Sequence, residues 1–238
     1  MGPTFAALER RATFAVAALV AVILTDLFAI YADAGEVELM NRIIDGQLVT
    51  LEEANTSDNR MAIAGVLTFA ALVAATITFI AWFSRAYKNL PALGATELRY
   101  RAGWSIGAWF VPFLNLWRPK QIANDIWRAS DPEARPDQGA EWRDKPVPGF
   151  LTTWWVLWVV SLYAANLTLR LYIGEETPQD IRRSDYADIL HLWVDIGAAV
   201  LAIVVVRKIT RRQAERHARI AGAVPPIPAV DSPVAPPA

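Results

Sequence analysis

The sequence predicts an all-α integral membrane protein, in which four spanning helices form a bundle and one additional tryptophan-rich segment does not span. Three observations lead to this prediction. Of the 238 residues, 54% are hydrophobic, and the mean hydropathy is positive. The apolar residues are gathered in long blocks without helical or strand periodicity, as in segments immersed in lipid. Lysine and arginine are distributed unevenly among the segments that connect these blocks.

Four apolar blocks are long enough to cross a bilayer. A helix rises about 1.5 Å per residue, so a hydrocarbon core of ~30 Å requires roughly 20 residues. The first block follows Arg10 and Arg11, but it is too long for a signal peptide and lacks a clean cleavage pattern. We expect spans at residues 12–31, 61–83, 150–172 and 189–206, within a membrane domain of residues 12–206.

A fifth apolar run, from Trp104 to Trp117, lies within the stretch "GWSIGAWFVPFLNLWRPKQIANDIWRAS" at residues 103–130. Its 14 residues would reach only about 21 Å as a helix, which is short of the ~30 Å core. Pro112 interrupts the run and should kink a helix, and Arg118 prevents its extension. Length therefore argues against a crossing.

The distribution of basic residues gives an independent test, because lysine and arginine concentrate on the cytoplasmic side of membrane proteins. If residues 103–130 do not cross, four spans place 18 basic residues inside and 4 outside. If they do cross, five spans give at best 14 inside and 8 outside. The acidic segments 32–60 and 173–188 fall outside in the first arrangement. We therefore predict four spans, with both termini in the cytoplasm.

Residues 103–130 should then begin and end on the cytoplasmic side, in one of two arrangements. The first, which we favour, is a kinked helix along the inner headgroup boundary, where Ile122, Ile126 and Trp127 form a narrow apolar face. The second is a re-entrant hairpin that turns near "VPFLN", with Asn115 satisfying backbone carbonyls. Indole rings favour the interface, since they combine an apolar body with one N–H donor. The candidate interfacial anchors are Trp104, Trp109, Trp117 and Trp127.

Periodicity and composition assign the remaining segments. Residues 32–60 should form two short helices resting on the outer membrane surface, the second starting at a capping box from Thr50 to Glu53. A ligand-binding cap is the alternative for this segment. A proline-rich, almost uncharged tail cannot form a packed core and should be disordered. The terminal segments are a cytoplasmic N-terminus at 1–11, a basic helical extension at 207–221 and this tail at 222–238.

Polar residues within spans are costly and are functional candidates by default. The candidate polar cluster consists of Asp26, Asn166, Arg170, His191 and Asp195, and its four ionisable members fall in the outer leaflet of the four-span topology. One interpretation is an ion-pair network in which Arg170 neutralises Asp26 or Asp195. Another is a proton or solute site that opens outward, with His191 as a sensor. In the third, Arg170 and His191 snorkel to the surface.

Several classes of chemistry are not expected from this sequence. The chain has no cysteine, and His191 and His217 are too few for most imidazole metal or haem sites. Hydrolase, phosphate-binding and dinucleotide-binding motifs are missing, and Arg170 near the two intramembrane aspartates argues against an aspartyl protease. A net charge of -1 gives no reason to expect nucleic acid. We therefore predict no enzymatic activity, no catalytic residues, and no cofactor or metal ligands.

Motifs concentrated in the middle of the chain carry a family resemblance. They are Phe83 to Leu90 (aromatic-Arg-Ala-Tyr-basic-Asn-Leu), Leu98 to Tyr100, Gly103 with Trp104, Trp109 to Pro119, and Ile126 to Ser130. In these motifs the chain resembles the bacterial membrane family called domain of unknown function 4328, from about residue 10 to about residue 210. Arg101 departs from the smaller residue common in that family. The resemblance implies a multi-pass membrane protein without an assigned activity, so no catalytic residue follows from it.

Together these features predict a non-enzymatic scaffold or interaction protein of the bacterial inner membrane, acting through its tryptophan-rich cytoplasmic platform. The alternative is a small transporter or channel subunit that uses the outer polar cluster. The expected partners are the lipid bilayer and a membrane or cytoplasmic protein. The lone GxxxG from Gly103 to Gly107 is too common to specify dimerisation.

Overall fold

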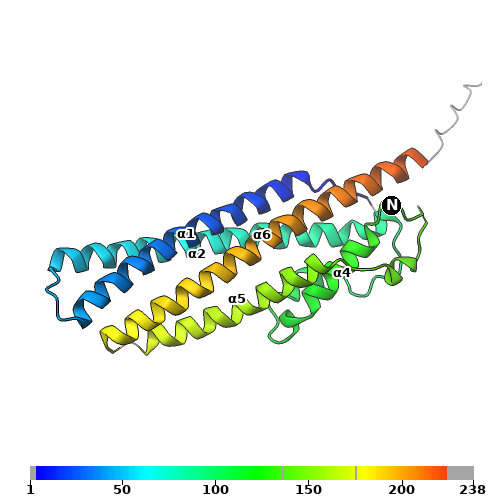
Figure 1. Ribbon diagram of the computed structural model, residues 1–238. Helices are drawn as coiled ribbons and strands as arrows, with labels where there is room; N and C mark the ends of the chain where they lie inside the picture. The colour runs from blue at the N-terminus through cyan, green and yellow to red at the C-terminus, as the bar shows by residue number, and fades with distance from the viewer. Residues whose placement is uncertain (1–3, 136, 175, 224–238) are drawn as a thin grey trace, which may run out of the picture.

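The computed structural model describes residues 4–135, 137–174 and 176–223. Its main elements are four long antiparallel helices, α1 (Glu9–Ile44), α2 (Leu51–Lys88), α5 (Gly149–Ile173) and α6 (Pro178–Ala223) (Figure 1). Each is long and apolar enough to cross a membrane, and each contains one of the four predicted spans. The predicted all-α class is confirmed. We call the end of the bundle where α1 starts and α6 finishes the terminal end, and the opposite end the distal end.

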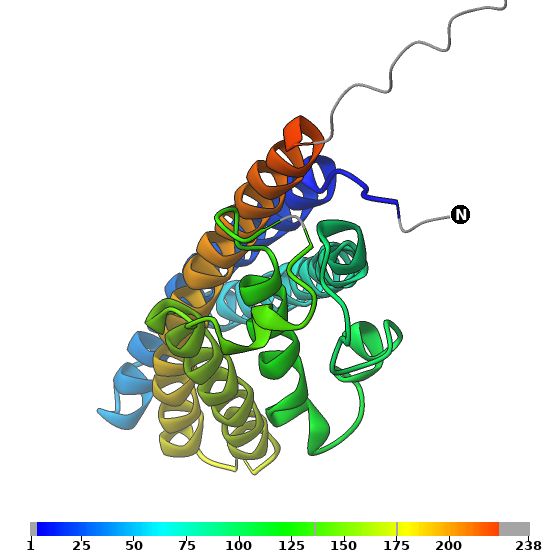
Figure 2. The same cartoon turned by 90° about the vertical axis from the view of Figure 1, so that its right-hand side faces the viewer.

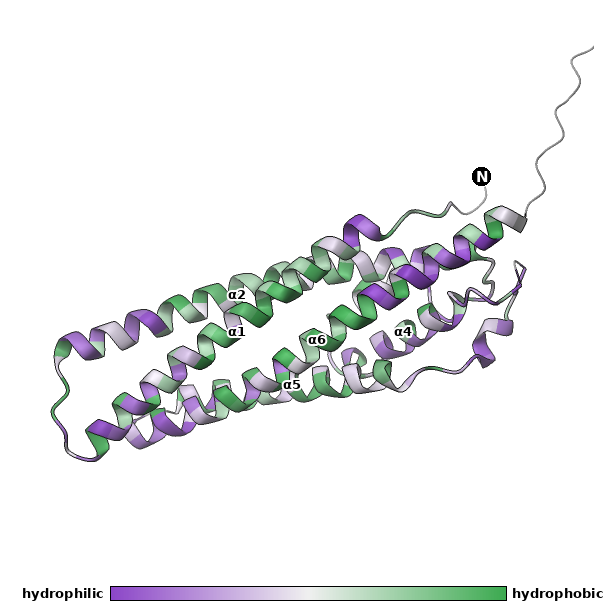
Figure 3. Ribbon diagram, turned by 45° about the horizontal axis from the view of Figure 1, so that its top comes forward, coloured by the Kyte–Doolittle hydropathy of each residue, from purple (hydrophilic) through white to green (hydrophobic). Residues whose placement is uncertain are grey.

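The long helices are arranged in the order α2, α1, α6, α5, with α1 and α6 in the centre. Alanines such as Ala15 in α1, Ala71 in α2 and Ala202 in α6 are buried between the helices, and small side chains allow helix backbones to approach closely. Larger apolar side chains such as Phe14 and Phe69 point outward, as suits a surface that faces lipid. The bundle is therefore apolar in its middle and hydrophilic toward its ends (Figure 3).

The distal end differs from our prediction of two short helices resting on the membrane surface. Residues 32–44 continue α1, and residues 51–60 are the first turns of α2, so both spanning helices project beyond their apolar stretches. The predicted capping box is present, with the Thr50 hydroxyl accepting from the Glu53 amide and the Glu53 carboxylate accepting from the Thr50 amide. It marks the start of the long helix itself, because no break follows it before Lys88.

Between α2 and α5 the chain folds into a compact unit at the terminal end, which we call the terminal cap (residues 89–148). It contains η1 (Leu90–Leu93), α3 (Trp104–Gly107), η2 (Leu114–Leu116), α4 (Arg118–Ala129) and η3 (Glu141–Asp144). None of these five elements is long enough to span a bilayer. Seen from the terminal end, the cap lies on the side of the bundle between α2 and α5 (Figure 2).

Helix α4 corrects the prediction of an amphipathic helix on the membrane surface. All twelve of its residues are buried or half-buried, and Ile122 and Ile126 are fully buried together with the carboxylate of Asp125. The polar side chains are enclosed because neighbouring segments supply partners, as when Arg128 donates from Nε to the carbonyl of Lys145 at 2.7 Å. The three apolar residues form a narrow face, which suggested that α4 contacts the membrane on one side and water on the other. In the fold, neighbouring segments of the protein surround the helix on several sides.

The hairpin of residues 103–117, which contains α3 and η2, extends from the cap along the bundle. Its Trp109 ring lies between Phe79 and Phe83 of α2 and Trp155 and Trp158 of α5, with centroid distances of 5.4 to 6.1 Å. All four partners belong to predicted spans, so the hairpin reaches the level of the apolar bundle. This geometry favours the re-entrant arrangement over the interfacial one.

Two further features of the terminal end bear on the predictions. The carbonyl of Leu116 in the hairpin accepts from Trp155 Nε1 at 3.1 Å, so an indole performs the task we assigned to Asn115. Helix α6 continues unbroken to Ala223 and includes the predicted basic extension. The predicted proline-rich tail lies outside the described residues from 224 onward.

Candidate intramembrane binding site

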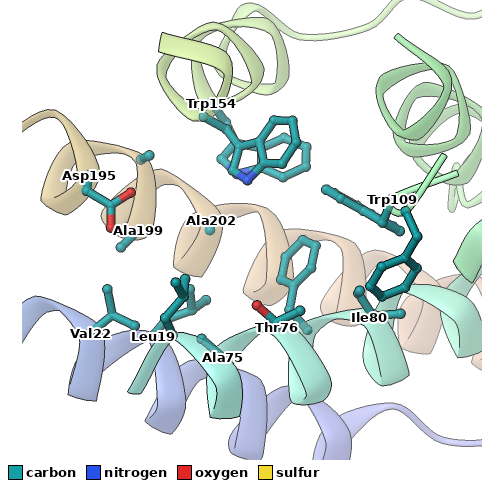
Figure 4. A pocket seen from close by; sticks show the side chains of 15 residues that line it. Leu19, Val22, Ala75, Thr76, Ile80, Trp109, Trp154, Asp195, Ala199 and Ala202 are labelled. Carbon is teal, nitrogen blue, oxygen red and sulfur yellow. The ribbon is translucent and has the colours of Figure 1, made fainter. Parts of the chain in front are cut away.

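A pocket of about 210 Å³ lies among the four long helices and is closed toward the terminal end by the hairpin (Figure 4). Small residues on α2 and α6, such as Ala75, Ala199 and Ala202, leave the space, while the large rings of Trp154 and Trp109 lie side by side along one wall. The space exists because α2 and α5 occupy opposite ends of the helix order and have few direct contacts, such as that of Phe79 with Trp154, whose ring centroids lie 5.9 Å apart. The hairpin fills only part of the gap between them.

The pocket reaches the outer surface of the bundle. Its lining includes Leu72 and Phe110, whose side chains are 52% and 66% exposed. Both lie at the height of the predicted spans, where the surroundings of the bundle are hydrocarbon. A ligand can therefore enter sideways from the lipid.

Asp195 of α6 is the one ionisable residue among the fifteen described residues that line the pocket (Figure 4). Its Oδ1 accepts from the Ser161 hydroxyl of α5 at 2.6 Å. A carboxylate in an apolar environment is stable only with hydrogen bonds or an opposite charge. One serine supplies one such bond, so Asp195 can accept further donors from a ligand.

The polar cluster continues from Asp195 toward the distal end. His191, one helical turn away, places Nε2 3.4 Å from Ser161 Oγ and Nδ1 3.2 Å from Asp188 Oδ1. Asp26 of α1 is fully buried, and neither of its carboxylate oxygens has a hydrogen-bond partner among the described residues. Its carboxyl is close enough to those of Asp195 and Asp188 and to the His191 imidazole to interact electrostatically with them. Three carboxylates, one imidazole and one hydroxyl are thus gathered where α1, α5 and α6 meet, an arrangement that can hold a proton or a cationic group.

The structure brings together Asp26, His191 and Asp195 from the predicted cluster, but not Asn166 and Arg170. Both of these side chains are exposed, and Asn166 Nδ2 donates to the carbonyl of Leu162 on its own helix. Arg170 has no ion-pair partner among the described residues, so it does not neutralise either aspartate. At about 100° per residue, Asn166 and Arg170 lie roughly 140° and 180° around α5 from Ser161. Their spacing of four residues in the sequence showed that Asn166 and Arg170 share one face of α5, but it did not show whether that face points into the bundle or outward.

Ser161 and Asp188 are members of the cluster that the sequence did not reveal. Asp188, His191 and Asp195 follow one another at intervals of three and four, a spacing that places them on one face of α6. That signal was present in the sequence, but Asp188 falls one residue outside the predicted span. Ser161 carries no such signal, because a single serine in an apolar helix is common.

The four candidate interfacial tryptophans have different surroundings. Trp104 lies under the guanidinium of Arg118 at 4.1 Å, and Trp127 lies between Phe150 and the guanidinium of Arg212. Trp109 is packed in the aromatic cluster described above. Only Trp117, which is 46% exposed, presents a large part of its ring to the surroundings. Most of these indoles therefore build the cap and the pocket.

Comparison with known families follows the resemblance seen in the motifs. The model of the family described as "Domain of unknown function (DUF4328)" matches residues 45–211, which include α2, the terminal cap, α5 and most of α6. The match begins just before α2, whereas we expected it to begin near residue 10. Neither the search of curated proteins nor the search of solved structures gave a match. Because the matched region is most of its length, the chain belongs to the DUF4328 family.

Proposed function

We propose that this protein is a non-enzymatic intramembrane binding protein for an amphiphile with an apolar body and a cationic or hydrogen-bond-donating group. The observation that carries this proposal is the pocket itself, which is apolar apart from the Asp195 carboxylate and the Thr76 hydroxyl. The volume of about 210 Å³ exceeds that of an engineered cavity of about 150 Å³ that holds a benzene molecule. The apolar body occupies this space, and its polar group lies against the carboxylate.

The absence of catalytic activity is part of the proposal and is supported by the geometry of the cluster. Asp188, His191 and Ser161 form a row like that of a serine hydrolase, but the Ser161 hydroxyl donates to Asp195, not to the imidazole. Ser161 also lies in the middle of α5, where the helix uses the backbone amides. An oxyanion formed there would lack a pair of free N–H donors.

Saturable quenching of tryptophan fluorescence tests the binding proposal. The probes are a nitroxide-labelled long-chain amine and the matching long-chain carboxylic acid, added to the full chain in mild detergent. We expect the amine to quench at lower concentrations than the acid, because it can donate to Asp195. Asp195→Asn, which keeps the shape of the pocket, should reduce this preference at least several-fold.

A matched pair of substitutions controls for partition into detergent. Ala199→Leu adds volume inside the pocket, whereas Val200→Leu alters a side chain that is 46% exposed on the next position of α6. Only Ala199→Leu should abolish the saturable component. Equal, non-saturable quenching in the original chain and both variants would contradict the proposal.

A second candidate function is a scaffold that presents the terminal cap to a protein partner. The observation that favours it is the attachment of the cap to α6, where Gln213 donates to the Ser130 hydroxyl and accepts from Asn89. A pull-down in mild detergent, with and without residues 222–238, tests whether partners bind and whether the tail recruits them. Recovery of the same proteins with a variant that disrupts the cap would argue against this function.

The transporter or channel alternative rests on the buried carboxylates of Asp26 and Asp195 and the imidazole of His191. The pocket, however, extends from Asp195 toward the hairpin at the terminal end, away from the distal end. Proton flux into liposomes that contain the protein discriminates between the two. We expect no flux above that of empty liposomes; a flux abolished by Asp26→Asn would favour transport.

A further inference from the structure

A second cavity, of about 260 Å³, lies at the terminal end where α6 leaves the apolar bundle. Here the ribbon of α6 changes from hydrophobic to hydrophilic (Figure 3). The cavity is formed by one aromatic residue of α4 and five residues of α6, namely Trp127, Arg207, Lys208, Arg211, Arg212 and Glu215. We call this surface the basic groove.

The basic groove carries more positive charge than its acidic neighbours offset. Arg211 pairs with Glu215 at 3.1 Å, and Arg212 pairs with Asp131 at 3.1 Å. Arg207 and Lys208 are exposed and have no ion-pair partner among the described residues. Two cations in the groove are therefore free to bind an anion.

Two cations of the groove, Lys208 and Arg212, are positioned by aromatic rings. Trp127 and Phe150 meet edge to face at 5.3 Å, Arg212 lies 4.3 Å from the Trp127 ring, and Lys208 Nζ lies 4.8 Å from the Phe150 ring. Arg212 Nε also donates to the carbonyl of Trp127 at 3.3 Å. Lys208 and Arg212 are thus held in place before any ligand arrives, which lowers the entropy cost of binding.

The height of the groove identifies the kind of anion. Arg207 directly follows Val206, the last residue of the α6 span, and Phe150 opens the α5 span. This is the level of the lipid headgroups, where basic pockets between helices bind acidic headgroups. Arg207 with Arg211, and Lys208 with Arg212, are spaced four residues apart, so the cations form two adjacent rows along α6.

We infer that the basic groove binds the phosphate of an anionic phospholipid from the leaflet at the terminal end. The chemistry required is a phosphate diester with net negative charge, whose oxygens accept from the guanidinium and ammonium groups while the acyl chains lie against α5 and α6. This site is separate from the intramembrane pocket, which takes an apolar body and a donor group. The two sites can therefore be tested independently.

Native mass spectrometry of the full chain in mild detergent tests this inference. The probes are phosphatidylglycerol, phosphatidylcholine and inorganic phosphate, added separately. We expect phosphatidylglycerol to bind at least tenfold more tightly than phosphatidylcholine. The double variant Arg207→Gln, Lys208→Gln should lose most of this preference.

The matched control is the double variant Arg10→Gln, Arg11→Gln, which removes the same charge from exposed residues at the start of α1. It should change phosphatidylglycerol binding less than twofold. An equal loss in both variants would show general attraction to a basic surface and would overturn the inference. Binding of inorganic phosphate as tight as that of the lipid would assign the groove to a soluble anion. Displacement of the lipid by an acidic peptide at equal concentration would assign the groove to a protein partner. Either result would overturn the inference.

Both variants replace exposed side chains, so the fold should persist. Equal thermal unfolding midpoints for the two variants and the original chain would verify this. If the groove variant alone unfolds early, the single variant Lys208→Gln, which leaves Arg207 in place, keeps the comparison decisive. Its phosphatidylglycerol preference should fall several-fold, and an unchanged preference would overturn the inference.

Discussion

Arg216 is fully buried at the terminal end, and its guanidinium serves backbone carbonyls of the cap. Nε donates to Leu93, Nη1 to Asp131 and Ala134, and Nη2 to Arg135, at 2.7 to 3.1 Å. Leu93 is the last residue of η1, and the other three residues follow α4, so these carbonyls lie where regular helical hydrogen bonding has ended. Burial lowers the pKa of Arg216, but a guanidinium remains charged and keeps all its donors. The Arg216 side chain thus supplies hydrogen-bond donors that regular secondary structure would otherwise provide to these carbonyls.

We expect Arg216→Met to destabilise the protein by roughly 2–4 kcal/mol, because it removes four hydrogen bonds between a fully buried guanidinium and carbonyls of the cap. Arg216→Lys should recover only part of this loss, since an ammonium cannot match the planar fork of the guanidinium. The measurement is the thermal unfolding midpoint in detergent. Arg219→Gln, which removes an exposed arginine one turn away, is the control and should leave the midpoint unchanged.

Asp125 of α4 gives the cap a pH-dependent stability. Burial raises the pKa of its carboxyl to about 6, although Arg99, with Nε 3.4 Å away, opposes the rise. An unfolded aspartate has a pKa of about 4. Between these values the folded state binds more protons than the unfolded state, so the free energy of unfolding decreases as the pH rises from about 4 to about 6. Above that window the loss is complete, on the order of 3 kcal/mol.

The variant Asp125→Asn should remove this decrease. Its unfolding curve, followed by tryptophan fluorescence between about pH 4 and 7.5, should depend less on pH than that of the original chain. Asp144→Asn is the matched control, because it makes the same change at an exposed position of the same cap. A pH dependence that is the same in Asp125→Asn and the original chain would show that another group is responsible.

At the scale of elements, the hairpin of residues 103–117 depends on the packing of Trp109. The ring touches aromatic residues of both α2 and α5, while its Nε1 is buried without a hydrogen-bond partner among the described residues. We expect Trp109→Ala to cost roughly 2–4 kcal/mol through lost packing. Trp109→Phe should cost less, because it retains ring contacts and removes the unpaired donor.

Phe113 provides the control for this prediction. It lies on the same hairpin and is 75% exposed, so Phe113→Ala should have little effect on stability. The measurement is the unfolding midpoint together with protease cleavage within residues 103–117, which should increase only when Trp109 is lost. Equal cleavage of the two alanine variants would mean that Trp109 does not anchor the hairpin.

The long helices could be predicted from the sequence because their signal is local, a continuous apolar block of sufficient length. The surroundings of α4 could not, because the partners of Asp125 and Arg128 come from distant segments. The same limit explains the candidate site. Sequence spacing placed His191 and Asp195 on one face, but only the packing of α1, α5 and α6 shows that Ser161 joins them while Arg170 faces outward.

At the scale of the whole molecule, the order α2, α1, α6, α5 determines where ligands can bind. Because the first and last helices in this order have few direct contacts with each other, the bundle has an open side, which the cap and hairpin only partly fill. Hydropathy specifies how many helices span but carries no information on their neighbours. The pocket lies on a surface created by this order, so it could not be located from the sequence. The cations of the basic groove lie in the basic helical extension that the sequence predicted, but the contribution of Trp127 from α4 depends on the packing.

The orientation of the bundle in the membrane follows from charge, and it can be tested because the chain has no cysteine. The 18 to 4 division of basic residues predicts that the terminal end is cytoplasmic. Suitable positions must be exposed, and Gln47 at the distal end, Asp137 in the cap and Ala218 on α6 meet this condition, whereas Gln138 and Gln213 are buried. In bacterial spheroplasts, an impermeant maleimide should label Gln47→Cys, but Asp137→Cys and Ala218→Cys only after permeabilisation. Labelling of Asp137→Cys in intact spheroplasts, with Gln47→Cys protected, would reverse the orientation and place the basic groove in the outer leaflet.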